Sequence, residues 1–282
     1  MPTGAVPQLT LMVVHAHPVD ESTSTGGILA LYASRGVRTV VVTCTGGELG
    51  DGPGGVKPGE DGHDLHEVAA IREGELRRAC AHLGVWHLEL LGYRDSGMAG
   101  WDSRYREGAF CGVPVESAVN RIVQLIGRYR PQVVVTYDPH STYQHPDHVH
   151  AARVATRAVD AGDVVAKLYY KAHGSSYWRR LNQSLADIGI QRPAPSGEIL
   201  WMLESVEQRI TTTVDVGQVI DRKRTALHSH ASQVGSSLAG KLPAAQFSYA
   251  FDTEEYIRAR DTTGTSTPEG DLFTGLARVS SP

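Results

Sequence analysis

The chain has 282 residues, of which 41% are hydrophobic and 21% charged, and its formal net charge is −4. This composition is typical of a globular protein, and the weak negative charge gives no reason to expect a nucleic-acid partner, which usually binds a basic patch. Three scattered cysteines, the lack of an apolar run near the roughly 20 residues of a membrane span, and an N-terminus without a signal-like pattern favour a cytoplasmic protein that does not enter a membrane.

The first part of the chain alternates short apolar runs with an amphipathic segment. Residues 9–15 and 37–44 are predicted strands, and residues 26–35 form a predicted helix that Gly36 ends. Strand, helix and strand within about 35 residues predict a βαβ unit with a right-handed crossover and a parallel sheet. Residues 45–64 contain eight glycines and two prolines, so they predict a long, mobile loop that can act as a lid.

The same alternation continues to about residue 177 and then weakens. The further predicted helices are 66–83, 115–129, 148–161 and 220–232, and the further predicted strands are 86–91, 132–137, 167–173 and 209–214. The pattern predicts a doubly wound α/β fold, in which helices sandwich a mostly parallel, Rossmann-like sheet, with a less regular C-terminal portion. We expect a single domain over residues 1–261, with a core to about 175 and a subdomain over 176–261, and a flexible tail over 262–282.

Histidines and carboxylates gather directly after two of the predicted strands. Residues 17–20 (His-Pro-Val-Asp) follow the first strand, and residues 145–148 (His-Pro-Asp-His) follow the strand at 132–137. Ligands of such sheets bind at the carboxyl ends of the strands, and a catalytic zinc takes three imidazole or carboxylate ligands and keeps an open position. His17, Asp20 and His148 can form such a set. A lone histidine is more often a structural group, so the paired pattern carries the prediction.

These segments resemble the motifs of the LmbE/PIG-L deacetylase family. Its members carry Ala-His-Pro-Asp-Asp-Glu after the first strand and His-Pro-Asp-His after a later one, which match residues 16–21 and 145–148 here. Further matches are Thr45-Gly46-Gly47-Glu48, Arg72 with Glu75, Tyr93-Arg94-Asp95-Ser96-Gly97-Met98, and Ala226-Leu227 with His230 and Gln233. The resemblance runs from about residue 9 to about residue 258 and is nearest to actinobacterial deacetylases and amidases of mycothiol metabolism.

The resemblance implies roles for the matching residues in the chemistry. It implies that His17, Asp20 and His148 bind zinc. It also implies that His145, with Asp147 as its neighbour, assists the oxyanion or the leaving group, and that Tyr143 helps to polarise the carbonyl. The cofactor expected from the resemblance is therefore a single zinc ion.

Four further polar residues lie near predicted strand ends. The resemblance implies that Arg72 and Asp95 hold sugar hydroxyls and that Glu48 lies on a loop bordering the pocket. Arg94, beside Asp95, is a candidate for the same pocket. Charged residues at such positions are also common as solvated surface groups, and the sequence leaves this alternative open.

Val19 departs from the family, whose members carry an aspartate there as general base. General acid–base help is worth roughly 10²–10⁴-fold in rate, so we expect a slow enzyme or none. The valine can be an engineered change, or a natural one with His145 or Glu48 acting as base, or the mark of a binding descendant. Valine is close to aspartate in size, so we expect the metal ligands to keep their places.

The expected function is hydrolysis of the N-acetyl amide of an amino sugar of the N-acetylglucosamine type, in thiol-cofactor or antibiotic biosynthesis. A catalytically silent sugar-binding relative and an amidase acting on a mycothiol-type conjugate are the alternatives. The expected partner is a small N-acetylated amino-sugar conjugate. The sequence names neither the group attached to the sugar nor the oligomeric state.

Overall fold

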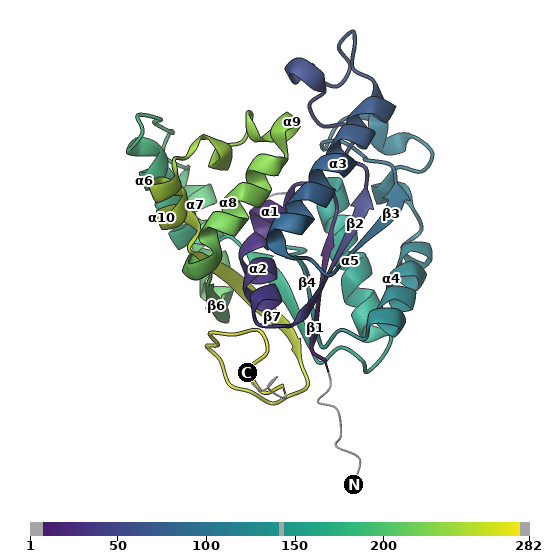
Figure 1. Cartoon of the computed structure of the whole chain (residues 1–282), viewed down its shortest axis with the longest axis vertical. Helices are drawn as coiled ribbons and strands as arrows, with labels where there is room; N and C mark the ends of the chain where they lie inside the picture. Colours follow the sequence, from purple (N-terminus) through teal and green to yellow (C-terminus); the bar gives the residue numbers. More distant parts are fainter. Residues whose placement is uncertain (1–7, 141–143, 277–282) are drawn as a thin grey trace.

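The computed structural model describes residues 8–140 and 144–276. Within these residues, seven strands form one sheet in the order β3-β2-β1-β4-β5-β7-β6 (Figure 1). The strands are β1 (Thr10–His15), β2 (Arg38–Thr45), β3 (His87–Tyr93), β4 (Val133–Tyr137), β5 (Lys167–Ala172), β6 (Thr212–Asp215) and β7 (Thr253–Asp261). Strands β1 to β5 are parallel, whereas β7 runs antiparallel to both β5 and β6. The predicted fold class is confirmed.

Helices cover both faces of the sheet. The α-helices are α1 (Asp20–Ser24), α2 (Gly26–Ser34), α3 (Leu65–Leu83), α4 (Val115–Tyr129), α5 (Pro146–Asp160), α6 (Ser175–Ala186), α7 (Gly197–Arg209), α8 (Ile220–Ser229), α9 (Ala231–Val234) and α10 (Ala244–Phe251). Helices α2, α3 and α8 pack on one face, and α4 and α5 pack on the other (Figure 1). None of the helices in the described residues is both long and apolar enough to cross a bilayer.

Local sequence signals explain where the elements of the first half begin and end. The carboxylate of Asp64 accepts a hydrogen bond from the backbone N of Glu67 and caps α3, and Gly84 ends this helix with a positive φ of 72°. Every residue of β4 is buried, as its run of valines predicts for a sheet covered on both faces.

The C-terminal half contains elements that the sequence did not predict. Helices α6 and α10, which were not predicted, share an apolar cluster with the predicted helix α8. Strand β7 is rich in charged residues, but its Glu254 and Glu255 are buried, and Glu254 pairs with Lys223 at 2.7 Å. Because buried charge pairs stabilise this strand, its sequence lacks the hydrophobic pattern that would predict it.

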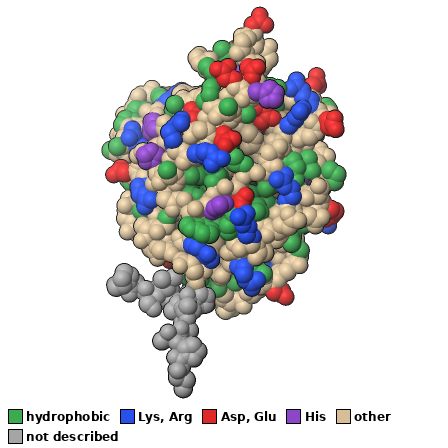
Figure 2. All heavy atoms as spheres, turned by 45° about the vertical axis from the view of Figure 1, so that its right-hand side comes forward, with side chains coloured by type: hydrophobic (Ala, Val, Ile, Leu, Met, Phe, Trp, Pro, Cys, Tyr) green, Lys and Arg blue, Asp and Glu red, His purple; other side chains and the backbone are tan. Residues whose placement is uncertain are grey.

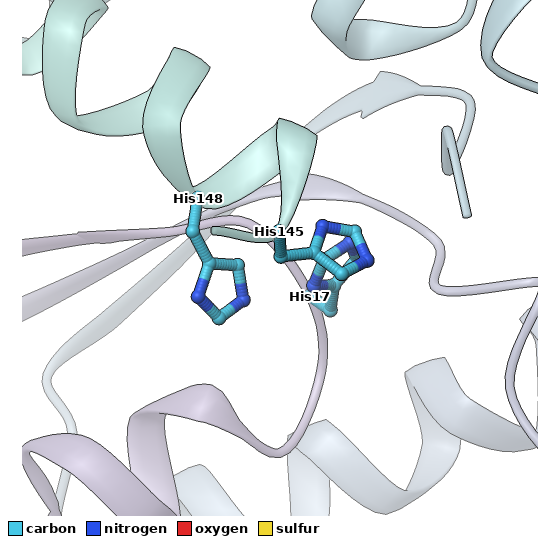
Figure 3. Close-up of side chains that lie close together, drawn as sticks. All are labelled: His17, His145 and His148. Atoms are coloured by element: carbon cyan, nitrogen blue, oxygen red, sulfur yellow. The ribbon is translucent and has the colours of Figure 1, made fainter. Parts of the chain in front are cut away.

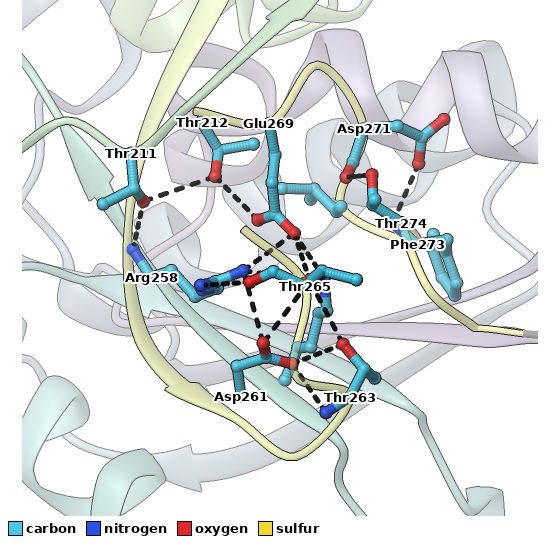
Figure 4. Close-up of polar contacts among 12 residues, drawn as sticks. Thr211, Thr212, Arg258, Asp261, Thr263, Thr265, Glu269, Asp271, Phe273 and Thr274 are labelled. Carbon is cyan, nitrogen blue, oxygen red and sulfur yellow. Dashed lines mark hydrogen bonds and ion pairs between the residues drawn. The ribbon is translucent and has the colours of Figure 1, made fainter. Parts of the chain in front are cut away.

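Residues 262–276 pack against the sheet, where the sequence predicted a flexible tail. Glu269 is buried and accepts hydrogen bonds from Lys167 and Tyr169 of β5. It also accepts one from Thr212 of β6 (Figure 4). Leu272 is fully buried in the core on the α2 face. The Thr, Gly and Ser content of this segment does not reveal the polar network, because the partners of Glu269 lie far away in the sequence.

The order in which the chain adds strands to the sheet reverses at β1. The chain leaves β1 toward β2 on one side, and β4 pairs with β1 on the other. The segments after β1 and β4 therefore meet at the carboxyl ends of the strands, where open α/β sheets bind ligands.

Candidate metal centre and active site

The three side chains predicted to bind zinc converge where β1 and β4 end. His17 follows β1, Asp20 begins α1, and His148 lies in the first turn of α5. His17 Nδ1 and His148 Nε2 each lie 3.4 Å from Asp20 Oδ2. The structure thus brings together groups that are 131 positions apart in the chain, from residue 17 to residue 148.

Two of the separations among these donor atoms have the length expected around a tetrahedral zinc ion. With bonds of roughly 2.1 Å, two ligand atoms at the tetrahedral angle lie about 3.4 Å apart. Both separations from Asp20 Oδ2 have this length. Burial raises the pKa of Asp20, but His148 and His17 outweigh it and hold that pKa well below its ordinary value, so the carboxylate is charged. Tyr137 donates to the same oxygen at 2.7 Å, which orients the carboxylate.

His145 forms a second group of nitrogen donors with His17 and His148, all within 4.8 Å of one another (Figure 3). His145 caps α5, because its Nδ1 accepts a hydrogen bond from the backbone N of Asp147 at 3.2 Å. Burial, with the nearby His17 and His148, lowers the pKa of His145 to about 4. In a neutral ring whose Nδ1 accepts, Nε2 carries the proton and is a donor. Asp20 therefore suits the third ligand position better than His145.

Carboxylates surround the ring of His17. Its Nε2 lies 3.2 Å from Asp147 Oδ2 and 3.5 Å from Asp95 Oδ1. Burial lowers the pKa of His17, but these carboxylates outweigh it and hold the pKa well above its ordinary value. Ser96 fixes Asp147 through its backbone N at 2.9 Å and through its hydroxyl. The result is a buried concentration of negative charge, which favours a bound cation.

Val19 lies in the wall of the same pocket, in a backbone conformation with φ 94° and ψ −27°. Its backbone N donates to Glu21 Oε2 at 2.9 Å. The other oxygen of Glu21 lies 2.7 Å from Nε2 of the buried His230. This buried pair fixes the position of the segment that carries Val19. It explains how Asp20 can keep its place although valine stands where the resemblance predicts aspartate.

A pocket of about 220 Å³ opens beside these residues, and Arg72 forms part of its wall. The buried guanidinium of Arg72 donates to Pro18 O at 2.6 Å and to Gly47 O. Gly47 has a φ of 65°, and a Cβ there would lie 2.5 Å from Arg72 Nη1, so glycine is required. Arg72 thus joins the loops that follow β1 and β2 at the rim of the pocket.

The other predicted substrate residues divide between this pocket and a neighbouring one. Asp95 lines both, whereas Glu48 and Arg94 line the neighbour. Burial raises the pKa of Glu48, and its Oε1 accepts a hydrogen bond from the backbone N of Asp95 at 2.9 Å. Tyr143, which the resemblance assigns to the carbonyl, lies outside the described residues.

Comparison with known proteins agrees with the motifs. The family model PIG-L, described as GlcNAc-PI de-N-acetylase, matches residues 12–159. The 1D-myo-inositol 2-acetamido-2-deoxy-alpha-D-glucopyranoside deacetylase of Acidothermus cellulolyticus is 39% identical over 284 residues, which cover 95% of each chain. The chain belongs to the PIG-L family. The resemblance seen in the sequence is thereby confirmed.

Solved structures show the PIG-L fold in proteins of low sequence identity. The 4-carboxy-2-hydroxymuconate hydratase GalB of Pseudomonas putida has a TM-score of 0.61 at 17% identity, covering 92% of this chain and 99% of that one. The zinc-inhibited form of teicoplanin deacetylase Orf2 has a TM-score of 0.55 at 17% identity, covering 90% and 100%. A hydratase and a deacetylase share the architecture, so the fold alone does not determine the reaction.

Several residues that shape this PIG-L site were not predicted as functional. Tyr137, the last residue of β4, donates to Asp20, and its position at a strand end was an available signal. Ser96 lies inside a recognised motif, but its bond to Asp147 joins distant segments. The pairing of Glu21 with His230 links residues 209 positions apart, and no local pattern reveals it.

Proposed function

We propose that this chain is a zinc-dependent deacetylase that hydrolyses the N-acetyl amide of an N-acetylglucosaminyl conjugate, with an inositol glycoside as the nearest substrate class. The observation that carries the proposal is the placement of two imidazole nitrogens 3.4 Å from one carboxylate oxygen, at the edge of an open pocket. The similarity to inositol-glycoside deacetylases over 95% of the chain supports the substrate class.

The residues present suit zinc rather than magnesium or calcium. Two imidazoles and one carboxylate form a catalytic zinc set, whereas the harder cations prefer oxygen ligands. A zinc ion held by His17, Asp20 and His148 would supply a Lewis acid and lower the pKa of a bound water to about 7.

His145 is placed to act as a donor in the reaction. Because Nδ1 accepts from the backbone of Asp147, Nε2 carries the proton that His145 would donate to the developing oxyanion or to the leaving amine. This arrangement argues against His145 as the substitute for the missing base. Glu48 stays a candidate for the general base, because burial raises the pKa of its carboxyl group. It lies, however, in the neighbouring pocket.

The pocket wall suits a polyhydroxylated ring. Asp95 offers carboxylate oxygens, and Arg72 is buried with its Nε lacking a hydrogen-bond partner. Trp101, 40% exposed, lines the same pocket and offers an aromatic surface for a sugar face. We propose that these side chains bind the amino-sugar ring, and that Tyr143 assists the carbonyl as in the family.

Val19 favours a second candidate function, that of a silent sugar-binding relative. Val19 stands where the family motif carries a carboxylate, and binding of a sugar does not need that group. An amidase acting on a thiol-conjugate amide is a variant of the first function.

A cytoplasmic setting, in which Cys44, Cys80 and Cys111 stay unpaired, belongs to the same proposal.

Release of free amine from an N-acetylglucosaminyl inositol tests the proposal. We expect slow, zinc-dependent release that stops when zinc is removed by a chelator and returns when zinc is restored. His148→Ala should abolish it, whereas Arg128→Gln, an exposed change on α4, should not. Tight sugar binding without any zinc-dependent release would favour the silent relative, and the absence of both would reject the proposal.

A further inference from the structure

A second pocket, of about 340 Å³, adjoins the candidate active site. Leu49 and Asp95 line both pockets, so one ligand can extend from the first into the second. The second pocket lies between the loop after β2, the first turn of α3, and the segment after β3. It is large enough to receive a ring or a small group attached to the amino sugar.

The charged residues of this second pocket differ in whether they also line the first pocket. Asp95 lines both pockets, and its backbone N donates to Glu48, which lines the second. Arg94 and Arg106 are exposed and also line the wall. Carboxylates suit hydroxyl groups near the amide, whereas guanidinium groups suit an anion farther along the ligand.

Neither guanidinium has a counter-ion in residues 8–140 and 144–276. No hydrogen bond or ion pair joins the side chain of Arg94 or Arg106 to another residue there. Other arginines of this region are occupied: Arg104 stacks on Tyr105 at 5.2 Å, and Arg121 donates to Leu91 O at 2.5 Å. The two pocket arginines therefore present their full donor sets to a ligand.

The backbone holds both arginines in place. Arg94 N donates to Gly108 O at 3.0 Å, and Phe110 N donates to Arg94 O at 2.9 Å, which ties the segment after β3 to the following turn. Arg106 begins that turn, since Ala109 N donates to Arg106 O at 3.1 Å. Two cations on fixed backbones at one wall form a site that needs little ordering on binding.

We infer that this second pocket binds an anionic group, a phosphate or a carboxylate, on the part of the substrate away from the amide. Arginine forks bind both groups in a bidentate way. The face shown in Figure 2 intersperses basic and acidic side chains instead of forming one basic surface, which fits a single anionic group better than a polyanion. The inference rests on the proposed function only in treating the two pockets as parts of one substrate site.

Binding to metal-free protein tests the inference without any catalysis. Titration calorimetry would compare myo-inositol 1-phosphate with myo-inositol, glucuronate with glucose, and inorganic phosphate alone. Charge-assisted hydrogen bonds contribute roughly 1.5–3 kcal/mol, so we expect the anionic partner of each pair to bind about tenfold or more tightly. The phosphate and carboxylate arms show which anion the pocket prefers.

The double variant Arg94→Gln with Arg106→Gln should remove this preference, whereas the matched control Arg104→Gln should keep it. Equal binding of charged and neutral ligands, or an unchanged preference in the double variant, would overturn the inference. Tighter binding of inorganic phosphate than of the inositol phosphate would point to an ion site and overturn it too. Hydrolysis of a neutral glycoside without anion preference would leave the proposed function standing and reject only this inference.

Discussion

At the scale of single residues, Val19 has the least favourable backbone conformation in the candidate site. Its φ of 94° lies in the left-handed region, where a β-branched side chain costs about 1–2 kcal/mol, whereas asparagine and aspartate tolerate it. We expect Val19→Asn to raise the free energy of unfolding by about 1 kcal/mol, measured by urea denaturation. A destabilised variant would show that the contacts of Val19 with the α6–α8–α10 cluster outweigh the strain.

Two substitutions of Val19 separate the effect of its backbone conformation from the effect of the missing general base. Val19→Asp should gain the same backbone relief and also restore a carboxylate, so we expect turnover to rise by roughly 10²–10⁴-fold. Val19→Asn is the matched control, because it lacks a basic oxygen of comparable strength. Equal turnover of the two variants in the amine-release assay would remove the missing-base argument.

The burial of Lys171 predicts that the stability of the protein depends on pH. Burial lowers its pKa to about 8, while its amine donates to Ala172 O and Glu255 O. Between about pH 8 and 10.4 the unfolded chain holds this proton and the folded chain does not, so stability rises with pH there. Relative to Lys171→Met, the wild-type free energy of unfolding should gain about 2 kcal/mol from pH 7.5 to 9.5 in urea titrations. A constant difference between the two proteins would contradict this.

At the scale of elements, the segment after β7 is fixed to the sheet by one buried carboxylate. Glu269 pairs with Lys167, which is fully buried. It also pairs with Arg258 (Figure 4). Leaving a buried lysine unpaired costs about 3–5 kcal/mol, so Glu269→Gln should lower the free energy of unfolding by about 3 kcal/mol. Arg35→Gln breaks the exposed pair with Asp271 of the same segment and should cost less than about 1 kcal/mol. Similar losses in both variants would show that Glu269 is not the main anchor.

The sequence predicted those elements whose apolar side chains face a single core. The valines of β4 and the capped, glycine-ended helix α3 are examples. Strand β7 and residues 262–276 were missed because they are stabilised by buried charge pairs between distant segments, which leave no periodic pattern. In the site, the motifs placed His17, Asp20 and His148 together, but the hydrogen bonds from Tyr137 and Ser96 required the fold.

At the scale of the whole molecule, the reversal of strand order at β1 positions the candidate site. That reversal brings the ends of β1 and β4 together and with them the proposed ligands from α1 and α5. A hydratase shares the same architecture, so the residues of the site, and not the fold, must determine the reaction. The decisive question is therefore which side chains hold the ion.

Anomalous diffraction at the zinc edge, on crystals of zinc-loaded protein, answers this question most directly. We predict one peak roughly 2.0–2.2 Å from His17 Nδ1, Asp20 Oδ2 and His148 Nε2, with His145 outside bonding distance. A peak bound by the three histidines without Asp20, or no peak among these residues at all, would contradict the account.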